Sequence, residues 1–439
     1  MLTRYKIILA LALPIIGGQI SQNILNLVDL AMVGQLGSIS VAAVGIASYT
    51  NFLAASFVMG LGAGVQALVS RRMGEGQPDG AVRALNGGLF LALLIGLPIS
   101  VGLFLASELL MGWLTVDQAL TAEASDYFGA RVLGSFFIGM NFAFRGYWNG
   151  VSLSMVYMRT LIIMHLANIL LNYLLIFGKF GFPALGVTGA GAGTAIATGL
   201  GTFLYFIQAF KKSKGAGFGT QLPKWANLLQ LWKLSLPSCI QMFFFALGFT
   251  AMFWIIGQIG TNELAAANVL LSLVLLAILP SMGLGMASAT LVGQSLGRKD
   301  LAEAQRWPWD VIKVSLLVIG TLGLLFFVAP TFFLKVFLTD PDVIDLATIP
   351  LQLTALMIVM EAFGSVLMSS LQGAGDTKSP MIVNLACQWG IFMPLAFLFG
   401  PVLGYGLLVV WILFGLSRLV QALAFIFIWR QGRWKEIKL

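Results

Sequence analysis

The sequence predicts an all-α integral membrane protein with twelve transmembrane helices, arranged as two six-helix lobes related by a parallel internal repeat. Three observations support this fold class: the composition, the lengths of the apolar segments and an internal duplication. Of the 439 residues, 59% are apolar and only 10% are charged, whereas soluble domains are about 25% charged. The mean hydropathy is +0.94. This composition argues against a soluble enzyme, a nucleic-acid-binding protein and a disordered protein.

Polar breaks divide the chain into apolar segments of membrane-spanning length. A transmembrane helix needs about 20 predominantly apolar residues. Its backbone polar groups must be satisfied within the segment, which excludes an open sheet. The twelve predicted helices are 5–33, 40–70, 84–113, 124–149, 157–178, 184–210, 229–257, 263–293, 308–338, 343–371, 379–399 and 403–430.

The second half of the sequence repeats the first at one constant shift in residue number. The matching motifs are Leu11–Pro14 with Leu234–Pro237, Gly34–Gly37 with Gly257–Gly260, and Met59–Gly62 with Met282–Gly285. Because each half has an even number of helices, both halves enter the membrane in the same orientation. We expect an N-lobe at 1–210, a cytoplasmic linker at 211–228 and a C-lobe at 229–439. The copy of the first segment also argues against a cleaved signal peptide.

The charged residues of the loops alternate in sign from one side of the membrane to the other. With the N-terminus in the cytoplasm, the cytoplasmic loops contain most of the basic residues. The opposite loops are mainly acidic, as at Asp117 and Asp340. Basic loops mark the cytoplasmic side, so both termini are predicted to be cytoplasmic. The net charge of +8 is then explained by the membrane, and no nucleic-acid partner is expected.

One carboxylate, Asp29, lies inside the first predicted helix. A mid-membrane charge costs at least about 2.5–3.5 kcal/mol on insertion scales. The residue at the repeat position is Met252, so the duplicated scaffold does not require an acid there. Interhelical hydrogen bonding alone explains the neighbouring amides better than it explains the acid, and we predict that Asp29 is functional. It ends a polar stripe at helical spacing: Gln19, Gln22, Asn23, Asn26 and Asp29.

A second polar stripe lies on the predicted helix 157–178, at His165, Asn168 and Asn172. Both helices run outward, and the two stripes are expected to meet at similar depth. The carboxylate, amides and hydroxyls could hold a proton or surround a sodium ion with oxygens, and the residues do not decide between them. For His165 we favour a hydrogen bond between helices over a proton relay. The predicted coupling residues are Asp29, Asn168, Asn172 and Thr194, with Gln22, Asn26, Asn141 and His165 as a supporting network.

Two further features lie within predicted helices. Glu361 is a second deep acid without a basic residue near it on its own helix, so its partner must come from elsewhere. We favour binding or coupling slightly over structural pairing, as a second candidate acid. Pro14 and Pro237 occupy equivalent repeat positions, where a proline removes a hydrogen bond and allows bending. We predict a hinge at Pro14, although a static kink fits equally well. Arg131 and Arg145 are interpreted as structural or surface-reaching side chains.

Enzymatic and metal chemistry have little support in the sequence. No set of catalytic acids, nucleophile and base is apparent, so we expect no catalytic residues. His165 is the only histidine, which excludes a multi-histidine metal site. Cys239 and Cys387 lie in apolar runs and are interpreted as small buried side chains. We expect no metal site and no cofactor.

Several motifs together resemble the multidrug and toxic compound extrusion (MATE) family over nearly the whole chain. Asp29 and the run Asn168–Tyr173 look like the DinF-like branch of that family. The other motifs are the Leu-x-Leu-Pro openings of both halves, Gly34–Gly37, Gly257–Gly260, Phe144–Gly150 and Leu371–Thr377.

This resemblance implies two lobes around a central cleft and alternating access, with inward cation flow driving drugs outward. It implies that Asp29 is the coupling acid, that Pro14 is the bend, and that Asn168 and Thr194 belong to the N-lobe pocket. Asn172 departs from the pattern, because many relatives in this branch have an aspartate there. Glu361 stands where the sodium-coupled branch usually has an acid.

The combined expectation is a proton-driven antiporter that exports lipophilic, often cationic, drugs or toxins. We expect it as a monomer among the lipids of the bacterial cytoplasmic (inner) membrane. A sodium-coupled exporter is the alternative. A flippase for lipid-linked saccharides ranks lower, because pyrophosphate substrates would favour several deep arginines. An integral-membrane enzyme is the remaining class.

Overall fold

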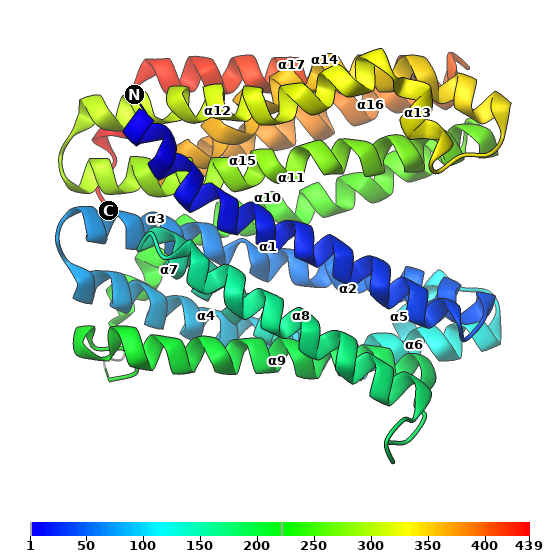
Figure 1. Ribbon diagram of the computed structural model, residues 1–439, viewed down its shortest axis with the longest axis horizontal. Helices are drawn as coiled ribbons and strands as arrows, with labels where there is room; N and C mark the ends of the chain where they lie inside the picture. The colour runs from blue at the N-terminus through cyan, green and yellow to red at the C-terminus, as the bar shows by residue number, and fades with distance from the viewer. Residues whose placement is uncertain (1, 221–222) are drawn as a thin grey trace. The chain divides into compact units, whose positions relative to one another are not determined.

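The computed structural model describes residues 2–220 and 223–439, and the described chain is helical throughout, apart from short turns and loops (Figure 1). Eleven helical segments of this part are long and apolar enough to cross a membrane. The longer helices are α1 (Leu2–Gly34), α2 (Ser38–Met59), α3 (Leu61–Gly74), α4 (Pro78–Leu105), α6 (Gln118–Val132), α7 (Ser135–Gly150), α8 (Ser154–Phe177), α9 (Gly186–Ser213), α10 (Trp225–Gly257), α11 (Thr261–Gly297), α12 (Leu301–Val328), α14 (Pro341–Ala374) and α17 (Gly406–Gln431).

Some predicted segments contain a break. The segment 124–149 consists of α6 and α7, interrupted at Leu133 and Gly134, and for this reason it is the one predicted span outside the eleven. A Cβ at Gly134 would lie 2.8 Å from Ala195 Cα, so glycine allows α9 to pass close to the break. Short helices continue two other segments, α5 (Ser107–Leu114) after α4 and α13 (Pro330–Lys335) after α12. A third segment is itself built from two short helices, α15 (Lys378–Leu385) and α16 (Met393–Phe397).

The segment from Lys378 to Val402 is not a regular α-helix. It includes π-helical turns at Ala386–Phe392 and Leu398–Val402. Such turns are rare and occur mostly as single insertions in α-helices. Trp389 lies in the first of them and donates from Nε1 to the Phe244 carbonyl oxygen at 3.2 Å. The apolar pattern of 379–399 predicted the helix but not this change of pitch.

The chain folds as two compact units. One is Gly17–Phe243, and the other combines Met1–Ile16 with Phe244–Leu439. Both boundaries lie inside helices, in α1 and α10, each a few residues after a proline. The units are defined by packing, whereas the predicted lobes are the two copies of the repeat. The lobe boundaries therefore stay a prediction.

Each unit has its own buried core. In the second unit, Trp411 of α17 is fully buried and donates from Nε1 to Thr354 Oγ1 of α14 at 2.9 Å. The first turns of α1 belong to this unit, and Ile8 and Leu11 pack in its second apolar cluster. In the unit Gly17–Phe243, Phe128 and Tyr127 of α6 pack with residues of α2 and α9.

The same glycine-mediated helix crossing occurs once in each unit. A Cβ added to Gly62 of α3 would lie 2.7 Å from the Phe142 carbonyl oxygen of α7. The equivalent positions of the second repeat behave alike, since a Cβ on Gly285 would lie 3.0 Å from the Ser365 carbonyl oxygen. Small residues allow helix backbones to approach closely in membranes. The internal repeat is thus visible in the packing as well as in the sequence.

We expect Gly146→Ala to destabilise the unit Gly17–Phe243. The added Cβ would lie 2.3 Å from the Gly62 carbonyl oxygen and 3.1 Å from Gln66 N. Backbone atoms cannot rotate away as a side chain does, so α3 and α7 must separate, at a cost of about 1–3 kcal/mol. Thermal unfolding of the detergent-purified protein measures the effect. Gly102→Ala is the control, because no atom lies within 4 Å of a Cβ there. Equal unfolding temperatures for the two variants would contradict this crossing.

Candidate functional site

The two predicted polar stripes meet between α1 and α8. Asn172 Nδ2 donates to Asp29 Oδ1 at 2.8 Å and to Asn168 Oδ1 at 3.0 Å. Asn168 and Asn172 are 2% and 1% exposed, and Asp29 is half-buried. The expected similar depth of Asp29 and Asn172 is therefore confirmed by a direct hydrogen bond. The roles of these residues in coupling stay a prediction.

The other atom of the Asn172 amide is unsatisfied. Its Oδ1 is buried and has no hydrogen-bond partner in the described structure. Gly193 of α9 faces this oxygen, and a Cβ there would lie only 2.2 Å from it. Buried polar atoms are normally hydrogen-bonded, and an exception needs an explanation. Here the unsatisfied acceptor belongs to the same side chain that binds the Asp29 carboxylate.

Arg131 of α6 is a neighbour of the site that the sequence analysis missed. Its guanidinium interacts electrostatically with Asp29. It also donates to Ser48 Oγ at 2.9 Å and to the Tyr127 hydroxyl. We interpreted Arg131 as structural or surface-reaching, and these hydrogen bonds are structural ones. The sequence did contain one clue, an arginine within an apolar segment of the lobe that includes Asp29.

His165 forms a second connection between α1 and α8. Its Nδ1 lies 2.8 Å from Ser21 Oγ, and its Nε2 lies 3.1 Å from Gln22 Oε1. Gln22 Nε2 donates in turn to Asn26 Oδ1 at 3.2 Å. His165 is buried, while Gln22 and Asn26 are exposed. The contacts agree with the favoured interpretation of His165 as a histidine hydrogen-bonded between helices.

Asn141 and Thr194 make contacts of a different kind. Asn141 Nδ2 of α7 donates to the Thr198 carbonyl oxygen at 3.2 Å, and its Oδ1 accepts from Thr202 Oγ1 at 2.8 Å. These bonds connect α7 to α9. The Thr194 hydroxyl donates to the Ala190 carbonyl oxygen of its own helix at 2.9 Å. Asp29, Asn168 and Asn172 are therefore joined by hydrogen bonds, whereas Asn141 and Thr194 have their hydrogen-bond partners elsewhere.

Glu361 of α14 has its basic partner on α17. Its Oε2 lies 3.9 Å from Arg418 NH1, and the two side chains are 16% and 20% exposed. Arg418 NH1 also donates to Gln421 Oε1 at 3.1 Å, and its guanidinium carbon lies 5.0 Å from the Phe414 ring centroid. The expectation of a partner from another element is confirmed. Arg418 itself was missed, although it is the first charge within the segment 403–430.

Pro14 and Pro237 leave their helices continuous. α1 extends from Leu2 to Gly34 and α10 from Trp225 to Gly257, each with its proline inside. The hinge role of Pro14 stays a prediction. Within residues 2–220 and 223–439, no group of three or more His, Cys, Asp or Glu side chains could hold a metal ion. Cys239 and Cys387 are buried and not disulfide-bonded.

Comparison with known proteins identifies the family. The sequence model of the MatE family matches residues 14–174 and 237–398. The chain belongs to the MatE family. The two matches begin at Pro14 and Pro237, which are equivalent positions of the internal repeat. MatE proteins are membrane transporters rather than enzymes, which confirms the predicted class and the all-helical multi-pass fold.

Sequence relatives align with nearly the whole length of this MatE protein. It is 25% identical over 436 residues to the "Probable multidrug resistance protein NorM" of Thermotoga maritima, covering 98% of this chain and 93% of the relative. It is 28% identical over 423 residues to the protein of the same name from Agrobacterium fabrum, covering 93% and 90%. These names do not single out the DinF-like branch.

The fold is similar to that of solved transporters. An outward-facing multidrug resistance MATE family transporter of the MOP superfamily aligns with a TM-score of 0.88 at 21% identity, covering 98% of this chain and 95% of that one. A MATE structure in the straight conformation aligns with a TM-score of 0.87 at 21% identity, covering 98% and 96%. At this level of identity the likeness shows the fold.

Proposed function

We propose that this MatE protein is a proton-coupled multidrug exporter of the DinF-like branch, and that it releases lipophilic, often cationic, compounds to the outside. The observation that supports this most is the hydrogen bond that Asn172 Nδ2 donates to the Asp29 carboxylate. Relatives named as multidrug resistance proteins support the substrate class. Related MATE structures described as complexes with MaL6 and Br-NRF support the binding of ligands by this fold.

In this proposal the Asp29 carboxylate accepts a proton that enters from outside. Protonation removes the negative charge, which ends the attraction between Asp29 and Arg131 and weakens the charge-assisted hydrogen bond from Asn172. The outer part of α1 is then free to repack against α8 while the helix bends near Pro14. One proton moving down 100 mV yields about 2.3 kcal/mol. That energy sustains a drug gradient of roughly fifty-fold.

The contacts around Asp29 favour a proton over a sodium ion. A sodium site needs several oxygens directed at one point. Asn172 instead directs its amide nitrogen, a hydrogen-bond donor, at Asp29 and at the Asn168 oxygen. The unpaired Asn172 Oδ1 is the one feature of the site that favours sodium, so a sodium-coupled exporter remains the second candidate. A lipid-linked saccharide flippase ranks lower, because Arg131 is already engaged by Ser48 and Tyr127.

The surroundings of the protein follow from the same proposal. We place it as a monomer in a bacterial cytoplasmic membrane with both termini in the cytoplasm. The support is the excess of basic residues in the loops on that side, together with the bacterial origin of the relatives. Glu361 is proposed as a structural partner of Arg418 and not as a second coupling acid.

The decisive experiment is efflux of a fluorescent cationic dye in inverted membrane vesicles that contain the protein. A pH gradient and a sodium gradient are imposed separately, the second at fixed pH. We expect the pH gradient alone to drive dye transport, with vesicles lacking the protein as the control. If only the sodium gradient drives transport, the coupling ion is sodium and not the proton. No dye movement under either gradient, for a protein correctly inserted, would contradict drug export.

A further inference from the structure

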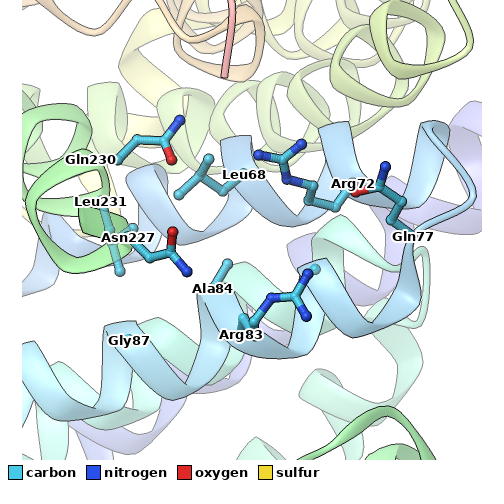
Figure 2. Close-up of a pocket in the computed structure, with 10 residues that line it drawn as sticks. Leu68, Arg72, Gln77, Arg83, Ala84, Gly87, Asn227, Gln230 and Leu231 are labelled. Atoms are coloured by element: carbon cyan, nitrogen blue, oxygen red, sulfur yellow. The ribbon is translucent and has the colours of Figure 1, made fainter. Parts of the chain in front are cut away.

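A polar pocket lies within the unit Gly17–Phe243, and neither Asp29 nor its hydrogen-bond partners line it. It has a volume of about 190 Å³ and lies between the end of α3, the start of α4 and the start of α10. Figure 2 shows the side chains of Arg72 and Arg83 together with those of Asn227 and Gln230 around this space, with Leu68 and Ala84 between them. Two guanidinium groups and the amides of Gln77, Asn227 and Gln230 therefore line one concave surface.

The pocket is positively charged, because its described lining residues include two arginines and no acidic residue. Arg72 NH1 is paired with Glu75 Oε2 at 2.7 Å, so part of its charge is neutralised. Arg83 is half-buried and makes no hydrogen bond or ion pair with the described part of the chain. Guanidinium groups bind phosphate oxygens with two parallel hydrogen bonds. An unengaged arginine beside three amides is thus suited to a phosphate group.

The position of the pocket indicates where that phosphate comes from. The lining of α4 extends from Gly80 to Gly87, about 10 Å along the helix axis. The pocket therefore reaches from the loop at Gln77 down beside the apolar part of the unit. On α10 next to it, Trp225 is 76% exposed and Lys233 is exposed, as is Lys224 just before the helix begins. Tryptophan and lysine at the end of an apolar helix are typical of the membrane–water interface.

We propose that this pocket binds the phosphate headgroup of an acidic phospholipid from the adjacent leaflet. Arg83 would contact the phosphate oxygens, and Asn227 and Gln230 would donate to the remaining headgroup oxygens. The inference concerns a lipid site and does not depend on the coupling ion or on drug export.

Native mass spectrometry of the detergent-purified chain tests the site, with phosphatidylglycerol added at increasing concentration. We expect Arg83→Gln to weaken phosphatidylglycerol binding about tenfold or more, as expected for the loss of one strong charged contact. Gln230→Ala should weaken phosphatidylglycerol binding less. This second pocket variant keeps the test valid if Arg83→Gln fails to fold. The control is Arg159→Gln, since Arg159 is an exposed arginine of α8 outside the pocket; it should bind like the parent.

Three results would overturn the proposal. Equal effects of Arg83→Gln and Arg159→Gln would mean that only surface charge attracts the lipid. Equal binding of phosphatidylcholine and phosphatidylglycerol would exclude selection of an acidic headgroup. Displacement of the lipid by millimolar inorganic phosphate would assign the pocket to a soluble anion instead. Because lipid binding is measured without transport, failure here is distinguishable from failure of the export proposal.

Discussion

Asp29→Asn is expected to abolish cation-driven drug export while the protein stays folded. Asparagine keeps the size of the side chain and can still accept the hydrogen bond from Asn172, but it cannot take up or release a proton at neutral pH. The roughly fifty-fold dye gradient that one proton sustains at 100 mV should fall to near unity. Dye efflux under an imposed pH gradient measures this loss, and thermal unfolding of the purified variant checks its fold.

Asp126→Asn provides the matched control for this experiment. Asp126 lies on α6 in the same unit, but its side chain is exposed. Asp126→Asn removes the same charge as Asp29→Asn, but at this exposed position it should leave the dye gradient unchanged. If Asp29→Asn exports dye as well as the parent, the coupling group lies elsewhere and the proposed mechanism is wrong.

Glu361→Leu is expected to lower the stability of the unit that contains α14 and α17. It leaves the Arg418 guanidinium without its acidic partner in a mostly buried position. Removing one member of a buried ion pair costs about 3–5 kcal/mol. The separation of 3.9 Å and the partial exposure of both side chains reduce our expectation to about 1–3 kcal/mol. The drop in the thermal unfolding midpoint measures it.

The double variant Glu361→Leu with Arg418→Leu separates pairing from other causes. Replacing both members by apolar side chains is often neutral or stabilising, so the double variant should recover the parent's unfolding midpoint. Asp345→Asn, at an exposed position of α14, is the control for loss of an acid. A double variant as unstable as Glu361→Leu alone would contradict the pairing. Export by the recovered double variant at the parent's rate would support a structural role for Glu361.

The helical fold was predictable because its signals are local or repetitive. Length and apolarity identify membrane helices one at a time, and one constant shift in residue number relates the two halves. The breaks were less predictable. The interruption at Gly134 depends on the close passage of Ala195, which belongs to a different helix and is distant in the sequence. The π-helical turns around Trp389 likewise left no mark in the apolar pattern.

The candidate site was predictable where helix geometry alone decides the contact. Asp29 and Asn172 lie on stripes with helical spacing at comparable distances from their helix ends. They were expected to meet at similar depth, and the structure joins them by a hydrogen bond. Arg418 was missed as the partner of Glu361, and Arg131 as a neighbour of Asp29, because each lies on another helix whose rotation and distance are set by packing. Spacing along one helix contains no information about that rotation. The division of α1 between two compact units was unforeseen for the same reason.

The shared glycine crossings have a consequence for how the protein can diverge. After the duplication, both copies kept the steric frame in which Gly62 meets Phe142 and Gly285 meets Ser365. The polar chemistry was not kept in both. The repeat positions equivalent to Asp29, Asn168 and Asn172 are Met252, Ile391 and Leu395. The steric frame and the polar stripes are thus separable: side chains at the stripe positions can change without rebuilding the helix crossings.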